Sequence, residues 1–215
     1  MSKAEDAVIE RLMQRHGRTY CDELGIDIER GTPSALFRWL VASILFSARI
    51  SADLALQAAR GLSDAGWRTP GKMKDTTWEE RVRVLNRSGY ARYDESTARM
   101  LGEDVAMIEE RYHGDLRRLR EAAGRDPDEE RKRLKEFKGI GEVGVDIFFR
   151  EAQAAWDELH PFLDKRAASA AAALGLPQDA PALATRVSKA DFPRLVAALV
   201  RTDLAGDADA IRTGE

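Results

Sequence analysis

Hydrophobic side chains recur at helical spacing along almost the whole chain, and no stretch alternates in the manner of a strand. Helices are predicted over residues 4–16 and 191–204, each with one apolar stripe. Residues 34–48 are apolar on nearly every side, which is typical of a helix buried at the centre of a domain. The two stripes consist of Val8, Ile9, Leu12 and Met13, and of Leu195, Val196, Leu199 and Val200. The chain is therefore predicted to be all-α.

Capping residues and prolines mark the ends of further helices. Ser51 can cap a helix that reaches Gly61, and Thr76 with Glu79 has capping-box spacing for a helix that ends near residue 88. Other helices are expected over 94–112 and 115–123, from Pro127 into a glycine turn, over 143–156, and from Asp164 onward, whereas residues after Ala205 are expected to fray.

The turn between two of these helices carries the most informative motif, a Gly-x-Gly pair at Gly139 and Gly141. Glycine accepts a positive φ and has no Cβ, so the N–H groups of Gly139, Gly141 and Val143 can approach a phosphate, helped by the helix dipole. Lys135 and Lys138 flank the turn. A DNA backbone is the expected anion, and a plain helix-to-helix connector is the alternative reading.

Composition restricts the partners. The 215 residues carry 34 Lys and Arg against 37 Asp and Glu, which argues against a protein that coats nucleic acid by charge alone but does not exclude local contacts. The one cysteine excludes an internal disulfide and a cluster that needs several thiolates, and the three histidines lack metal-ligand spacing. Without an apolar run of membrane length or an apolar leader, a cytoplasmic protein is expected.

Three segments together resemble the helix-hairpin-helix DNA glycosylases, the superfamily of endonuclease III. Residues Leu134 to Gly141 resemble the hairpin signature of that family. Asp164 stands where the family has an aspartate that opens the following helix. Residues 45–51 resemble a Leu-Leu-Ser-Ala-Gln-x-Thr segment of that family, and residues 88–97 resemble the turn and helix before the hairpin. The resemblance covers about residues 35–175.

The resemblance implies two helical lobes with a helix-hairpin-helix motif and a cleft between them. The expected divisions are an N-terminal helix over 1–33 that packs with the C-terminal lobe, a central lobe over 34–136, and a hairpin with C-terminal helices over 137–215. It also implies a structural monovalent cation, held by the backbone carbonyls of Lys135, Phe137 and Ile140.

Three departures from the family narrow the expected chemistry. Val143 stands where endonuclease III carries a lysine that attacks the sugar, and the four cysteines of the iron-sulfur cluster are missing. Ala42 stands where the adenine-mismatch branch has a glutamate. What remains resembles the lysine-free glycosylases, such as 3-methyladenine glycosylase II and the thymine-mismatch enzymes, which use one aspartate. Neither an iron-sulfur cluster nor another cofactor is expected.

Asp164 is the expected catalytic residue. A carboxylate near C1′ stabilises the positive sugar that forms when an N-glycosidic bond breaks. Aspartate before an alanine-rich helix is also an excellent N-cap, and both roles can coexist. Lys165, next in sequence, is a candidate phosphate contact or amine nucleophile, and Lys138 is a second phosphate contact.

Other candidates follow from base flipping, which leaves a gap in the duplex that the protein must fill. By position, Arg49 and Ile50 resemble the gap-filling residues of the family, although a solvated helix-end arginine is the alternative for Arg49. Trp39, Phe46 and Tyr93 are candidate pocket aromatics, for which core packing is the alternative.

The sequence thus predicts a monomeric, monofunctional DNA N-glycosylase of base excision repair that acts on double-stranded DNA with a lesion or mismatch. Two rival hypotheses remain open. One is a catalytically inactive DNA-binding or damage-sensing protein that keeps the hairpin, and the other is an all-α interaction domain without a DNA role.

Overall fold

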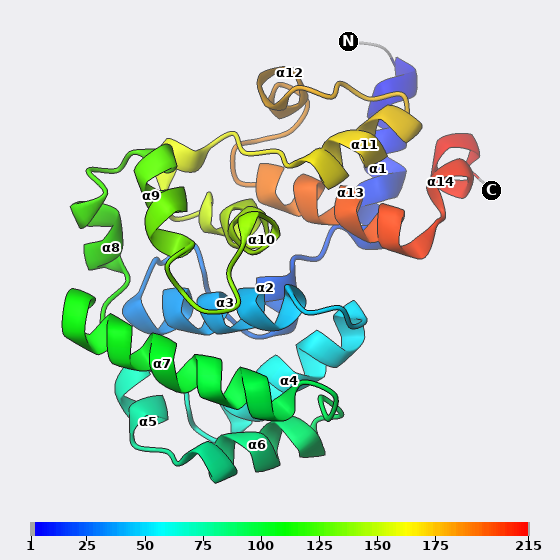
Figure 1. The fold of residues 1–215 in the computed structure, drawn as a ribbon. Helices are drawn as coiled ribbons and strands as arrows, with labels where there is room; N and C mark the ends of the chain where they lie inside the picture. Colours follow the sequence, from blue (N-terminus) through cyan, green and yellow to red (C-terminus); the bar gives the residue numbers. More distant parts are fainter. Residues whose placement is uncertain (1–2, 215) are drawn as a thin grey trace. The chain divides into compact units, whose positions relative to one another are not determined.

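The structure, a computed structural model, describes residues 3–214. Within that range every regular element is a helix, so the predicted all-α class is confirmed (Figure 1). The chain divides into two compact units, which we call the terminal unit and the central unit. The terminal unit comprises the described residues of Met1–Glu23 and Phe149–Glu215, and the central unit comprises Leu24–Phe148.

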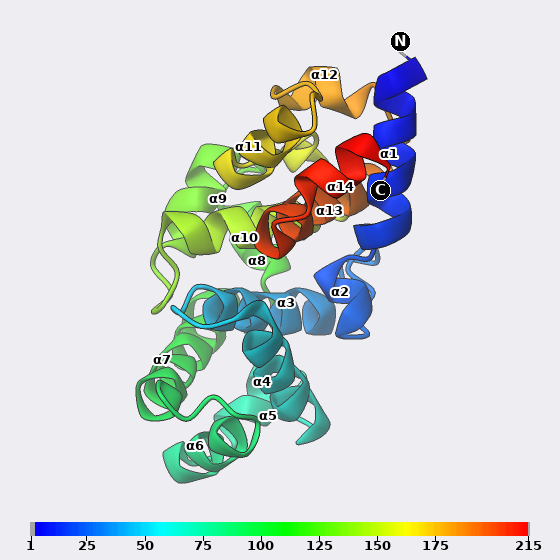
Figure 2. The same cartoon turned by 90° about the vertical axis from the view of Figure 1, so that its right-hand side faces the viewer.

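The terminal unit is built around α13 (Phe192–Ala205), which packs against α1 (Lys3–His16) and α11 (Lys165–Ala173). Its apolar stripe is buried together with Val8, Ile9 and Leu12 of α1 in one hydrophobic core. Figure 2 shows α14 beside α1, and α14 also contacts α11. The unit also holds α2 (Tyr20–Glu23), the end of α10 (Glu142–Ala152), the 3₁₀ turn η1 (Asp157–Leu159), α12 (Ala180–Ala184) and α14 (Ala208–Thr213).

The central unit is built around α3 (Pro33–Phe46), whose nearly all-apolar sequence buries it on most sides. Pro33 begins the helix, and the Thr32 hydroxyl caps it by accepting a hydrogen bond from Ala35 N. The remaining helices are α4 (Ala52–Asp64), α5 (Pro70–Lys74), α6 (Trp78–Arg87), α7 (Asp94–Tyr112), α8 (Arg117–Ala122), α9 (Pro127–Leu134) and the start of α10. Among them, α3 packs on α4, and α6 packs on both α4 and α7.

The unit boundaries at residues 24 and 148 differ from the predicted divisions at 34 and 136. The hairpin turn belongs to the central unit because it is fastened to α3 and α7. Trp39 Nε1 donates a hydrogen bond to the Phe148 carbonyl over 2.9 Å, and Lys138 N donates to Asp104 over 2.7 Å. The local sequence pattern cannot show which residues these long-range contacts join.

Two helix starts were predicted to within one residue. Ser51 caps α4 as expected, by accepting a hydrogen bond from Leu54 N. The capping box of α6, however, is formed by Thr77 and Glu80 rather than by Thr76 and Glu79. Thr76 instead donates its hydroxyl to the Met73 carbonyl at the end of the preceding helix, so the next threonine becomes the cap.

Two helix ends also differ from the prediction. α10 stops at Ala152 instead of residue 156, because the Gln153 side chain binds Phe162 and the backbone turns after it. Residues 208–213, which were predicted to fray, form α14. The Ile211 side chain is buried, and the Ile211 carbonyl accepts a hydrogen bond from Arg11. Within residues 3–214, no helix combines the length and the apolar character that crossing a membrane requires.

Candidate nucleic-acid interface and acid site

The hairpin turn between α9 and α10 is anchored by buried side chains, while its two glycines are exposed. The side chains of Phe137 and Ile140 are buried in the central unit, whereas Gly139 and Gly141 are exposed. Gly139 has a φ of 81°, and a Cβ there would lie 3.1 Å from Ile44 Cγ2. A Cβ at Gly141 would meet nothing within 4 Å. Gly139 therefore serves the fold, and Gly141 leaves open space in front of the helix.

The residues that start α10, Glu142 and Val143, follow directly on Gly141 and are exposed. The first N–H groups of any helix have no acceptor within the helix, and they carry the positive end of its dipole. Val143, in the first turn, keeps 64% of its surface exposed. The amides predicted to bind phosphate, at Gly139, Gly141 and Val143, thus belong to exposed residues, and the geometry suits an anion.

A buried carboxylate holds the turn from the side of α7. Asp104 Oδ1 accepts the Lys138 N–H over 2.7 Å, and Asp104 Oδ2 is buried with no hydrogen-bond partner among the described residues. Burial raises the pKa of Asp104 to about 7, against the opposing effect of the Lys138 N–H. Asp104 was not predicted as a site residue; an acid between Leu101 and Val105 on the buried stripe of α7 is the signal that could have found it.

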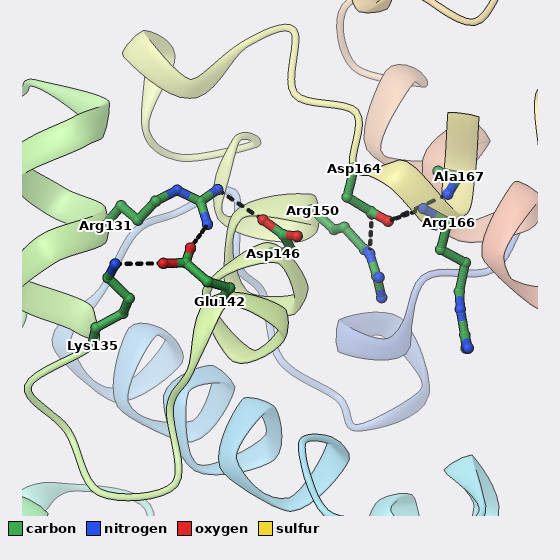
Figure 3. A network of polar contacts seen from close by, with 8 residues as sticks. All are labelled: Arg131, Lys135, Glu142, Asp146, Arg150, Asp164, Arg166 and Ala167. Carbon is green, nitrogen blue, oxygen red and sulfur yellow. Dashed lines mark hydrogen bonds and ion pairs between the residues drawn. The ribbon is translucent and has the colours of Figure 1, made fainter. Parts of the chain in front are cut away.

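The flanking cations of the hairpin are not equally free. Lys135 pairs with Glu142, which also pairs with Arg131 over 3.0 Å, and Arg131 reaches Asp146 over 2.7 Å (Figure 3). Lys135 and Arg131 hold the pKa of Glu142 below its ordinary value. The Lys138 side chain is exposed and forms no ion pair within residues 3–214. Only Lys138 of the two predicted flanking lysines is therefore a free cation.

A groove in the central unit brings three predicted residues together. Arg49, Tyr93 and Gly139 all line it, and its volume is about 430 Å³. The Arg92 guanidinium lies over the Tyr93 ring, 5.3 Å from its centroid. The other lining residues are Ile44, Ser47, Ala48, Tyr90, Ser96, Thr97 and Met100. Because Arg49 is exposed, the groove offers a cation and an aromatic face beside the hairpin.

The other predicted pocket and gap-filling residues are less exposed than Arg49. Trp39 is 1% exposed and donates its indole N–H to the Phe148 carbonyl, so it is a core residue and not a pocket wall. Phe46 is half-buried, with its ring centroid 6.3 Å from that of Trp39. Ile50 is also half-buried.

Asp164, in the terminal unit, is buried and fixed by three donors. Its Oδ1 accepts the backbone N–H groups of Arg166 at 2.8 Å and Ala167 at 3.3 Å, so it caps α11. Its Oδ2 pairs with Arg150 Nε (Figure 3). The carboxylate is therefore held in one orientation, and a cation opposes its charge.

Arg150 is the partner that the sequence analysis missed. Its side chain is 12% exposed, and it follows an apolar part of α10, where a charged residue signals a buried partner. Lys165, which follows Asp164, is exposed and forms no ion pair among the described residues. It remains accessible to an anion.

The potential metal-binding side chains of the described residues do not cluster. No group of three or more His, Cys, Asp or Glu side chains within residues 3–214 is arranged to hold a metal ion. Cys21 is buried. At the hairpin, the Phe137 carbonyl accepts the Ile140 N–H over 3.2 Å, which leaves it one lone pair for another partner.

Comparisons with known proteins identify the fold. No family model matches the sequence, and no curated protein matches it significantly. Among solved structures, a non-covalent complex of endonuclease III with DNA matches with a TM-score of 0.57 at 18% identity. A trapped covalent intermediate of endonuclease III with DNA, an estranged-adenine complex, matches with a TM-score of 0.54 at 17% identity. Each match covers 94% of this chain and 86% of the other, so the chain has the all-α fold of endonuclease III.

Proposed function

We propose that the protein is a monofunctional DNA N-glycosylase of base excision repair. The observation that carries the proposal is the carboxylate of Asp164, fixed by three donors in a fold that endonuclease III uses on DNA. Its substrate is double-stranded DNA that contains a damaged or mispaired base, and its product is an abasic site.

The reaction breaks the bond between C1′ of the sugar and a nitrogen of the base. The base leaves with the bonding electrons and gains a proton, and the oxygen of a water molecule adds to C1′. Positive charge develops on the sugar as the bond stretches, and the negative charge of Asp164 lowers the energy of that state. The fixed orientation of the carboxylate means that little reorganisation is needed.

The strand is held by the exposed parts of the hairpin. The amides of Gly139, Gly141 and Val143 bind one phosphate, and the free cations of Lys138 and Lys165 bind others. Arg49 and Ile50 occupy the gap that the flipped base leaves, with Tyr93 offering an aromatic face for stacking. The carbonyls of Lys135, Phe137 and Ile140 would hold a monovalent cation, for which Phe137 has one lone pair left.

The chain has no amine nucleophile at the start of α10, because Val143 occupies that position. An arginine such as Arg150 cannot replace it, since a guanidinium remains protonated and forms no Schiff base. Lys165 is the remaining amine beside the acid. We propose that it binds phosphate, so the strand stays intact after the base has left.

Duplexes that each carry one lesion or mismatch test this function. The protein is incubated with the panel, and each sample is then treated with alkali, which cleaves abasic sites. One duplex should be nicked only after alkali, and Asp164→Asn should abolish the nick. Strand breakage without alkali, together with a covalent adduct trapped by borohydride, would contradict the monofunctional assignment.

A second function is favoured by one observation, the ion pair of Asp164 with Arg150. A cation at the carboxylate weakens its effect on a positive sugar, as expected of a DNA-binding or damage-sensing protein without catalysis. Such a protein would bind abasic-site DNA equally well with and without Asp164→Asn, and it would release no base from any duplex.

A further inference from the structure

The guanidinium of Arg150 uses one of its three nitrogens for an ion pair. We call the side that carries the other two nitrogens, Nη1 and Nη2, the uncommitted side. Its Nε pairs with Asp164 Oδ2, while Nη1 and Nη2 form no hydrogen bond with any residue within 3–214. Neither nitrogen is among the buried polar atoms that lack a partner, and the side chain keeps 12% of its surface exposed. Figure 3 shows the tip of the guanidinium pointing away from Asp164. Four N–H donors are thus left for a partner outside the described residues.

The position of this guanidinium is set by its neighbours on α10. Gln153 donates its amide to the Phe162 carbonyl over 3.1 Å and accepts the Phe162 N–H over 2.9 Å. The ring of Phe149 meets the ring of Phe162 edge-on, with centroids 5.4 Å apart. These contacts fasten the segment before Asp164 to α10. Arg150, between them in sequence, is held opposite the acid before any ligand arrives.

A phosphate fits the uncommitted side best. A planar guanidinium presents its N–H groups in a fork that matches two phosphate oxygens. Charge gives a second reason. The positive charge of Arg150 opposes the negative charge of Asp164, and a phosphate on the far side of the guanidinium compensates it. The carboxylate then acts on a nearby positive sugar with less opposition.

We propose that Arg150 binds a phosphate of the strand whose base is released, and that this contact frees the charge of Asp164 for the reaction. The proposal rests on the proposed glycosylase function for its second half only. In this proposal Arg150 binds DNA, and binding of the strand reduces the opposition of Arg150 to the negative charge of Asp164. The ion pair then has a role in an active enzyme.

A scan with methylphosphonates tests the contact at single phosphates. Each duplex carries an abasic-site analogue and one neutral methylphosphonate, moved along the strand one position at a time. For the unmodified protein, one position should weaken binding about tenfold, the usual effect of losing a charged hydrogen-bond pair. With Arg150→Gln, the same position should cost less than about twofold, because the partner is already lost.

Arg166→Gln is the matched control. The Arg166 side chain is exposed and pairs with Asp203 over 3.3 Å, and only its backbone contacts Asp164. This variant should show the same position-specific loss as the unmodified protein. If Arg150→Gln melts at a much lower temperature, the scan is repeated with Arg150→Lys, which keeps the charge without the fork. The position-specific loss should then be smaller than in the unmodified protein.

Two results overturn the proposal. Equal losses at every position in Arg150→Gln and the unmodified protein would make Arg150 a structural partner of Asp164 only. An undiminished loss in Arg150→Lys would show that the planar fork of Arg150 is not what binds the phosphate. The fate of the glycosylase function is read separately from base release in the lesion panel. Position-specific coupling without any base release would retain the phosphate contact and reject the enzyme.

Discussion

Two helix N-termini in this protein are used in opposite ways. At α11, the Asp164 carboxylate accepts the first N–H groups, so the protein supplies its own anion. At α10, the residue before the helix is Gly141, and the space in front of it is open. The residue before each helix makes the difference. An aspartate there binds the first N–H groups and stabilises the helix, whereas a glycine leaves them accessible to a ligand.

The largest effect on stability is expected at Asp164. Asp164→Ala removes the cap of α11 and leaves Arg150, whose side chain is only 12% exposed, without its ion pair, which should lower the free energy of unfolding by about 3–5 kcal/mol. Asp126 is the matched control, because it caps α9 with the same two contacts, at 2.9 and 3.3 Å, but is exposed and has no ion pair. Asp126→Ala should cost only about 1 kcal/mol. Urea denaturation measures both, and equal losses would show that the ion pair contributes nothing.

The next effect concerns Asp104 and pH. Burial raises the pKa of Asp104 to about 7 from 3.8, so the folded protein holds a proton that the unfolded chain releases. The stability from this group is fully present below about pH 4 and is lost as pH rises through about 7. Between pH 5 and pH 8 the loss should be about 2–3 kcal/mol, from 1.36 kcal/mol per pKa unit.

The variant Asp104→Asn tests this dependence, since an amide oxygen can still accept the Lys138 N–H. Urea midpoints of the variant and the unmodified protein should approach or cross as the pH rises, with the variant relatively more stable at pH 8 than at pH 5. Parallel curves for the two proteins would show that Asp104 does not titrate in this range.

The two hairpin glycines should separate stability from binding. Gly139→Ala forces a left-handed φ on alanine and brings its Cβ within 3.1 Å of Ile44, for a cost of about 1–3 kcal/mol. Gly141→Ala meets nothing within 4 Å and should unfold at the same urea concentration as the unmodified protein. Its methyl group should still weaken binding to duplex DNA. A Gly141→Ala variant with full affinity would remove this helix start from the interface.

The smallest effect is expected at Glu142. Glu142→Gln releases Lys135 and leaves Arg131 with Asp146, which adds one net positive charge beside the open helix start. DNA binding should tighten at low salt, and the slope of log affinity against log salt should steepen by about 0.9. Glu129→Gln is a suitable control because it adds the same charge by releasing Lys132, which lies on the same helix. An unchanged slope in Glu142→Gln would place the hairpin cations away from the DNA.

Local patterns predicted most of the helices, because apolar spacing and caps such as Ser51 act within a few residues. They also predicted Asp164 at the start of its helix. That Arg49 and Tyr93 line the same groove as Gly139 follows only from the folded structure. The sequence marks Arg150 and Asp104 as charged residues among apolar neighbours, but it could not name their partners, since these lie on other elements. Trp39 was misplaced as a pocket residue because an indole on an apolar helix has the same pattern in a core and in a binding site.

Single-turnover base release tests the central claim, that Asp164 acts on the sugar, most directly. The unmodified protein and Asp164→Asn are compared in excess over the duplex that the panel identifies, with affinity for abasic-site DNA measured alongside. The account predicts that the unmodified protein releases the free base from an intact strand and that Asp164→Asn slows release at least about a hundredfold, the scale of losing one preorganised electrostatic contact. Equal release rates in the two proteins would contradict it.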